Sequence, residues 1–279
     1  NYVVGEKEVI SLDKKSFNDD KVLKALLENT TCIIHLAGIN RDEDDFVIYK
    51  ENRRICNHIL SALKNKNLFP RFINISSIHE GSETAFGKAK RDNRIDLEKY
   101  YQKNQTKLLS FLTPNIFGPF CKPNYNSFVA TFCNNVLNGI DVLVHDPSAP
   151  VRLAYIDDVC ASFLGLLDGK TTSGFHKLPV EFNTTVGEVA NIISSFKSSR
   201  TKLITERVGA GLTRALYSTY LSYTPPGQFN YSVPSYADER GVFCEMLKTK
   251  DSGQFSFFTA HPGITRGGHY HHTKNEKFL

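Results

Sequence analysis

The sequence has 279 residues, 41% of them hydrophobic, and a formal net charge of +5. Its charges are mixed, as in residues 41–45, and no basic block follows the pattern of a nucleic-acid-binding surface, so nucleic acid is not an expected partner. No apolar run reaches the roughly 18 residues that a membrane-spanning helix needs, and the N-terminus has no signal-type segment. The composition therefore predicts a soluble protein without membrane insertion.

The six cysteines are scattered without CxxC pairing, and most have apolar neighbours. This usage is typical of reduced, buried thiols and predicts a cytoplasmic protein. Nothing before Ile33 resembles the glycine-rich turn that grips a dinucleotide pyrophosphate. The chain does not begin with Met and it stops at Leu279, within an apolar segment, so we expect a piece of a longer protein.

Apolar runs of strand length alternate with segments of helical period through the first two-thirds of the chain, which predicts a parallel sheet covered by helices. The expected strands are residues 32–37, 71–77 and 107–112, and the expected helices are residues 47–63 and 89–102. Residues 152–159 and 185–190 each predict a strand or cap that leads into a helix, the second with a capping box from Thr185 to Glu188.

The composition changes near residues 224–227, and the rest of the chain is rich in glycine and aromatic residues. Short alternating runs at 242–247 and 254–258 predict antiparallel strands. We therefore expect two domains, residues 1–232 and residues 233–279, and an α/β fold with a Rossmann-like parallel sheet in the first.

A histidine cluster near the C-terminus carries the strongest single pattern. Residues two apart in a strand face the same way, so His269 and His271 can point together while Glu276 returns on the next strand. Two imidazoles and a carboxylate suit zinc or another divalent transition metal. The spacing from Gly263 through these three residues resembles the first motif of the cupin family, which implies that residues 233–279 open an incomplete cupin barrel. His272 is expected on the other face.

A second constellation resembles the extended short-chain dehydrogenases/reductases. Leu36, Ala37 and Gly38 stand at the end of a predicted buried strand, where that family passes beneath the cofactor's adenosine and ribose. Ser77 closes the next predicted strand, where the family places a hydroxyl that hydrogen-bonds the reacting carbonyl oxygen.

The expected catalytic helix departs from the pattern of that family. Lys90 stands where the lysine of Tyr-x-x-x-Lys is found, but Phe86 takes the place of the tyrosine that would act as the acid. Three explanations stay open: a variant that protonates through Ser77 or through water held by Lys90, an inactive unit that still binds ligand, or a substitution that traps a complex. The predicted catalytic set is Ser77, Phe86 and Lys90, with Lys90 also contacting the cofactor.

Two further residues are predicted to bind substrate. Asn115 follows a proline in a segment that resembles the loop facing cofactor and sugar in the reductase family. Arg152 matches a position at which sugar-nucleotide members hold pyrophosphate, and a guanidinium suits that role because it pairs with phosphate through two hydrogen bonds. A surface salt bridge is the alternative for Arg152.

Residues 121–127, 216–223 and 271–279, together with the order of the two units, resemble a family of bacterial capsule and O-antigen enzymes that make the precursor of UDP-N-acetyl-L-fucosamine. The resemblance implies a homodimeric, bifunctional enzyme acting on UDP-4-keto-6-deoxy-N-acetylhexosamine. A zinc cupin would carry C3 epimerisation, and the reductase unit would use NADPH to reduce C4, giving a UDP-N-acetyl-6-deoxy-talose sugar. The alternatives are a catalytically impaired, reductase-like nucleotide-sugar binding protein and an enzyme in which only the epimerase is active.

Overall fold

The computed structural model describes residues 2–4, 7–102, 108–167, 173–268, 270–273 and 275–277. These residues form two compact units. The first comprises residues 1–116 and 152–182, and the second comprises residues 117–151 and 183–279. This division does not follow the boundary at residue 232 that the sequence predicts, and the predicted domains 1–232 and 233–279 stay a prediction. Among the described residues, none of the helices has the length and apolar character that crossing a bilayer requires.

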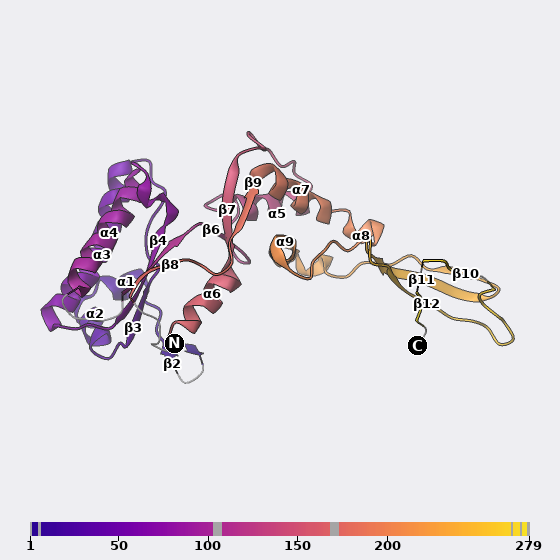
Figure 1. Ribbon diagram of the computed structural model, residues 1–279, viewed down its shortest axis with the longest axis horizontal. Helices are drawn as coiled ribbons and strands as arrows, with labels where there is room; N and C mark the ends of the chain where they lie inside the picture. The colour runs from indigo at the N-terminus through magenta and orange to yellow at the C-terminus, as the bar shows by residue number, and fades with distance from the viewer. Residues whose placement is uncertain are drawn as a thin grey trace. The chain divides into compact units, whose positions relative to one another are not determined.

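A four-stranded sheet organises the first unit (Figure 1). Its strand order is β3-β4-β5-β8, and all three pairings are parallel. The strands are β3 (Cys32–His35), β4 (Arg71–Ser77), β5 (Leu108–Thr113) and β8 (Gly174–His176). The predicted α/β class with a parallel, Rossmann-like sheet is therefore confirmed, because strands of the same direction are joined by crossover helices.

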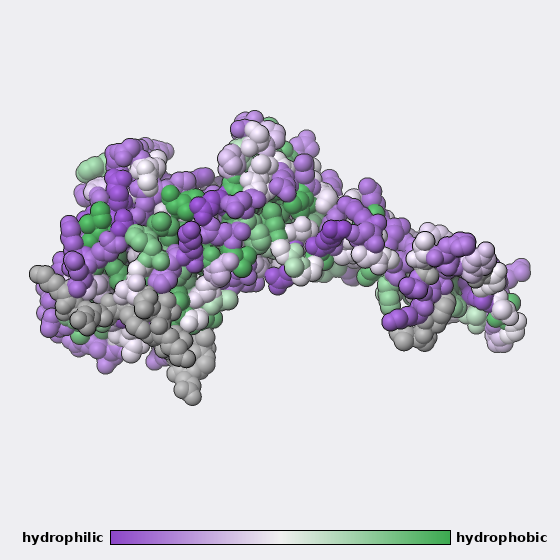
Figure 2. Space-filling view, viewed as in Figure 1, coloured by the Kyte–Doolittle hydropathy of each residue, from purple (hydrophilic) through white to green (hydrophobic). Residues whose placement is uncertain are grey.

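Helices cover both faces of this sheet. They are α1 (Lys14–Asn18), α2 (Asp20–Glu28), α3 (Asp45–Lys66), α4 (Ala85–Tyr101) and α6 (Ile156–Gly165). One core cluster joins Phe72 of β4 to α2, α3 and α4, whereas another joins Ile73 to Val159 and Phe163 of α6. Neighbouring residues of β4 thus enter opposite cores, as the two-residue period of a strand requires. Hydrophilic side chains predominate on the visible face of α3 and α4 (Figure 2).

The helix α4 begins earlier than the sequence pattern predicts. Its first residue is Ala85 rather than residue 89, because Thr84 caps the helix by accepting a hydrogen bond from the Gly87 backbone N–H at 3.1 Å. Such a cap satisfies one of the backbone donors that a helix start leaves free. The consequence is that Phe86 and Lys90 lie on a single helix, one turn apart.

Several short elements lie outside the four-stranded sheet and its helices. An antiparallel hairpin pairs β1 (Tyr2–Val4) with β2 (Lys7–Val9). The 3-10 helix η1 (Ile78–Gly81) follows β4 directly. A separate three-stranded sheet has the order β6-β7-β9, formed by β6 (Asn115–Phe117), β7 (Pro150–Tyr155) and β9 (Phe182–Thr185).

The second unit contains several helices. They are α5 (Phe128–Leu137), α7 (Val186–Phe196), α8 (Ser199–Lys202), α9 (Gly211–Ser222) and the 3-10 helix η2 (Pro226–Gln228). The expected cap of α7 is present, since Thr185 Oγ1 accepts from the Glu188 backbone N–H at 3.1 Å. The Glu188 carboxylate accepts a hydrogen bond from Thr184 Oγ1 at 2.6 Å.

The last elements form an antiparallel sheet of order β10-β11-β12. They are β10 (Tyr236–Asp238), β11 (Gly241–Lys248) and β12 (Gln254–Phe258). The two strands predicted in this region are therefore confirmed. Large apolar side chains of this sheet are exposed, namely Tyr236, Met246, Leu247, Phe255, Phe257 and Phe258.

Candidate functional site

The carboxyl ends of two parallel strands and the start of α4 meet in the first unit. A Cβ atom added at Gly38, just beyond β3, would lie 3.5 Å from Lys90 Nζ and 2.5 Å from Asn52 Oδ1. Lys90 Nζ in turn donates a hydrogen bond to the carbonyl oxygen of Ile75 on β4 at 3.1 Å. The predicted cofactor segment and the predicted catalytic lysine therefore lie together, at the sheet edge where open α/β folds bind ligands.

The segment after β3 is held in place by α3. Asn52 Nδ2 donates to the carbonyl oxygens of Ile39 at 2.6 Å and Ile48 at 2.8 Å. Leu36, Ala37 and Gly38 themselves are exposed. An exposed backbone segment anchored by a buried amide is suited to lie against a flat ligand, because its own shape is fixed before the ligand arrives.

Lys90 is buried among groups that affect its charge. Burial lowers the pKa of its ammonium, while Cys56 and Glu80 act in the opposite direction. The Nζ atom lies 5.6 Å from the centroid of the Phe86 ring, so the two side chains share one helix face. An ammonium with a lowered pKa releases a proton more readily, which is the property that a proton-relaying lysine needs.

His35, the last residue of β3, was not among the predicted site residues. It is buried, and its ring makes an edge contact with Phe72 at a centroid distance of 6.0 Å. Burial lowers the pKa of His35 to about 4, and the charge of Lys90 contributes to the same shift. His35 is therefore a neutral side chain near the candidate catalytic lysine at pH 7.

The two serines at the end of β4 have different partners. Ser76 Oγ donates to the Glu80 carboxylate, whereas Ser77 Oγ accepts a hydrogen bond from the His79 backbone N–H at 3.2 Å. Ser77 uses an oxygen lone pair in that contact, so the contact does not consume its own hydroxyl proton. In these two contacts only Ser76 gives its hydroxyl proton, and the role of Ser77 as a donor to a carbonyl oxygen stays a prediction.

Asn115 and Arg152, the predicted substrate residues, lie on the separate β6-β7-β9 sheet. Asn115 is exposed on β6. The guanidinium of Arg152 on β7 is paired with the Glu181 carboxylate. The structure thus contains the salt bridge that was the alternative for Arg152, and its binding of pyrophosphate remains a prediction that requires Glu181 to be displaced or shared.

The predicted metal ligands are described only in part. His269 lies outside the described residues. His271 Nε2 and Glu276 Oε1 lie 3.2 Å apart, and about a third of each side chain is exposed, 32% and 34%. His272 makes an edge contact with Tyr270. No group of three His, Cys, Asp or Glu side chains suited to a metal occurs within the described ranges.

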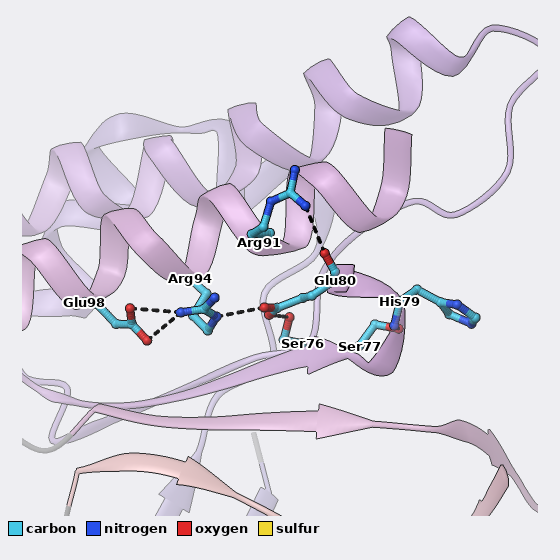
Figure 3. Close-up of polar contacts among 7 residues, drawn as sticks. All are labelled: Ser76, Ser77, His79, Glu80, Arg91, Arg94 and Glu98. Carbon is cyan, nitrogen blue, oxygen red and sulfur yellow. Dashed lines mark hydrogen bonds and ion pairs between the residues drawn. The ribbon is translucent and has the colours of Figure 1, made fainter. Parts of the chain in front are cut away.

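Sequence reasoning missed a set of charged residues behind Ser77. Glu80 is buried in η1, and its carboxylate contacts Arg94 of α4, Nε to Oε2 at 2.8 Å (Figure 3). An acidic residue three positions after Ser77 was visible in the sequence. Its partner, however, lies 14 residues away, and no local period links the two positions.

The sequence also matches known protein families over most of its length. Residues 5–174 match the NAD dependent epimerase/dehydratase family, and residues 236–279 match the polysaccharide biosynthesis C-terminal domain. The chain is 43% identical over 258 residues to a UDP-2-acetamido-2,6-beta-L-arabino-hexul-4-ose reductase from Pseudomonas aeruginosa. That alignment covers 92% of this chain and 69% of the relative.

Solved structures also resemble this chain in fold. The capsular polysaccharide assembling protein CapF from Staphylococcus aureus superimposes with a TM-score of 0.79 at 32% identity, covering 94% of this chain and 70% of CapF. A UDP-glucose 4-epimerase from Thermus thermophilus, in complex with NAD, gives a TM-score of 0.61 at 16% identity over 75% of this chain and 83% of the epimerase, a likeness of fold. The chain belongs to the NAD dependent epimerase/dehydratase family.

Proposed function

We propose that this chain reduces a UDP-bound 4-keto sugar with NADPH, as part of polysaccharide biosynthesis. The observation that carries the proposal is the 43% identity to a UDP-hexulose reductase over 92% of the chain. The site supports it chemically, because a desolvated lysine, a serine hydroxyl and an exposed segment beyond β3 lie at the carboxyl edge of a parallel sheet. The substrate proposed from the resemblance is UDP-4-keto-6-deoxy-N-acetylhexosamine.

The residues of the site have separate tasks in this proposal. When bound, NADPH supplies a hydride to the carbonyl carbon of the sugar. The Ser77 hydroxyl donates a hydrogen bond to the carbonyl oxygen and so stabilises the negative charge that develops there. Lys90 provides positive charge nearby and a proton through Ser77 or a water molecule, since Phe86 has no proton to give. Leu36, Ala37 and Gly38 would lie along the cofactor.

The reductase proposal has a direct test. NADPH absorbance is followed at 340 nm after the protein is mixed with UDP-2-acetamido-2,6-dideoxy-hexos-4-ulose, and substrate-dependent oxidation is expected. Lys90→Met should reduce the rate by about 100-fold, because it removes the charge and the proton source. Lys88→Met is the matched control, since Lys88 is two residues away and pairs with the exposed Glu83. Binding of NADPH and UDP without oxidation would instead favour a nucleotide-sugar binding protein.

We also propose that residues 233–279 open a zinc-binding cupin, in which C3 of the sugar is epimerised. The observation in favour is the approach of His271 Nε2 to Glu276 Oε1 within 3.2 Å, since a ring nitrogen and a carboxylate oxygen are both zinc ligands. A zinc ion held by these residues and His269 would act as a Lewis acid on a carbonyl oxygen. The resemblance to the capsule and O-antigen enzymes also supports a homodimer. Epimerisation at C3 together with reduction at C4 would give a UDP-N-acetyl-6-deoxy-talose product.

The metal proposal is tested by binding as well as by activity. Zinc bound after gel filtration should fall by at least about 10-fold in His271→Ala, because one of three protein ligands is lost. His272→Ala is the control and should keep its zinc, since its ring contacts Tyr270. Dialysis against a chelator should also stop solvent-deuterium exchange at C3. Equal zinc content in both variants would exclude His271 as a ligand.

A further inference from the structure

The carboxylate of Glu80 lies at the centre of a chain of polar contacts behind the candidate site (Figure 3). Glu80 accepts a hydrogen bond from Ser76 Oγ through one oxygen and pairs with Arg94 Nε at 2.8 Å through the other. Arg94 NH1 continues the chain to both oxygens of Glu98, at 2.8 and 2.9 Å. The network joins the end of β4, the η1 turn and two turns of α4.

This ion pair differs from the others on the same helix in its burial. The side chains of Glu80 and Arg94 are 9% and 16% exposed, whereas those of Glu83 and Lys88 are 79% and 42% exposed. Water screens an exposed ion pair, so such a pair contributes little to stability. Removing one partner of a buried pair is strongly destabilising, because the remaining charge is left buried without its counter-charge. The Glu80 pair therefore fixes where η1 lies on α4.

Backbone packing reinforces the same contact. A Cβ atom added at Gly87 would lie 2.2 Å from the carbonyl oxygen of His79, so the backbone of α4 comes very close to η1 at this glycine. Arg91 NH1 also donates to the carbonyl oxygen of Glu80 at 3.3 Å. On the other side of Ser77, Lys90 Nζ donates to Ile75. Helix α4 is thus bonded to the chain both before and after Ser77.

We propose that Glu80 is a positioning residue: through Arg94 it holds the turn between β4 and η1 on α4, and so sets where the Ser77 hydroxyl lies relative to Lys90. The catalytic part of this inference rests on the proposed reductase function. Glu80 itself is buried behind the turn and bonded to Ser76, so it acts through Ser77 rather than on the substrate. The placement of the turn is a property of the fold and can be measured separately.

The test uses Glu80→Gln, which keeps the shape and the acceptor for Ser76 but removes the charge that holds Arg94. We expect kcat for NADPH oxidation to fall by at least about 10-fold, because small displacements of catalytic groups are costly, with KM for NADPH unchanged within about two-fold. Hydrogen exchange of the amides of residues 77–82 should become faster, while the exchange of α5, α7 and α9 stays the same. Glu80→Asp, which keeps the charge, should recover part of kcat.

Glu83→Gln is the matched control, because Glu83 precedes the same helix but is exposed. Unchanged exchange at residues 77–82 in Glu80→Gln would overturn the inference, and so would faster exchange throughout the first unit, which indicates a general loss of stability. A wild-type protein that fails to oxidise NADPH would contradict the proposed function, whereas the exchange result would still decide how the turn is held.

Discussion

Replacing Phe86 with tyrosine is expected to raise kcat for 4-keto reduction by about 100-fold, within the range that general acids contribute. The Phe86 ring centroid lies 5.6 Å from Lys90 Nζ, and both side chains project from one face of α4. A phenol at this position would gain a proton to donate, and the nearby ammonium would lower its pKa. The measurement is steady-state NADPH oxidation with saturating 4-keto UDP-sugar.

Two controls separate the hydroxyl from changes in packing. Phe86→Leu removes the ring without adding an acid, so it should give no gain. Phe86→Tyr combined with Lys90→Met should lose most of the gain, because the phenol then has no neighbouring charge. If Phe86→Tyr only matched the wild-type rate, protonation would not limit turnover and the acid would have to come from elsewhere.

The stability of the first unit should fall between pH 6.5 and pH 4 because of His35. Its pKa is lowered from 6.5 to about 4 in the folded protein, so within this window the unfolded state binds a proton that the folded state does not. Unfolding free energy therefore rises with pH across the window, and protonation favours the unfolded state as pH falls. One pKa unit corresponds to about 1.4 kcal/mol, which gives about 2 kcal/mol between pH 7 and pH 5.

Urea unfolding followed by circular dichroism at pH 5, 6 and 7 measures this effect. In His35→Gln, the difference in unfolding free energy between pH 7 and pH 5 should shrink by about 2 kcal/mol, since the substituted residue does not titrate. His145→Gln, at an exposed position, should leave the difference as it is in the wild type. An identical pH dependence in His35→Gln and wild type would refute the assignment to His35.

The strand and helix pattern of the first unit could be predicted because it depends on local signals. The runs at β3, β4 and β5 are apolar and short, and the helices between them have a helical period. We predicted the start of α4 at residue 89, four residues late. Thr84 and Gly87, whose backbone N–H bonds to Thr84, come before the residues that show a helical apolar period. Caps depend on one or two residues, so periodicity alone passes over them.

The environment of the site was harder to predict than its members. Ser77, Lys90 and Gly38 follow recognisable spacings, and the structure brings their segments together. The burial of His35, and the pairing of Glu80 with Arg94, arise from packing between elements far apart in sequence. Such contacts are set by tertiary structure, which no window of the sequence contains. The roles of the predicted site residues remain predictions.

The close approach at Gly87 limits how this site can change. The backbone of α4 comes very close to η1 there, since a Cβ atom at Gly87 would lie 2.2 Å from the carbonyl oxygen of His79. A side chain at that position would therefore require the helix or the turn to move.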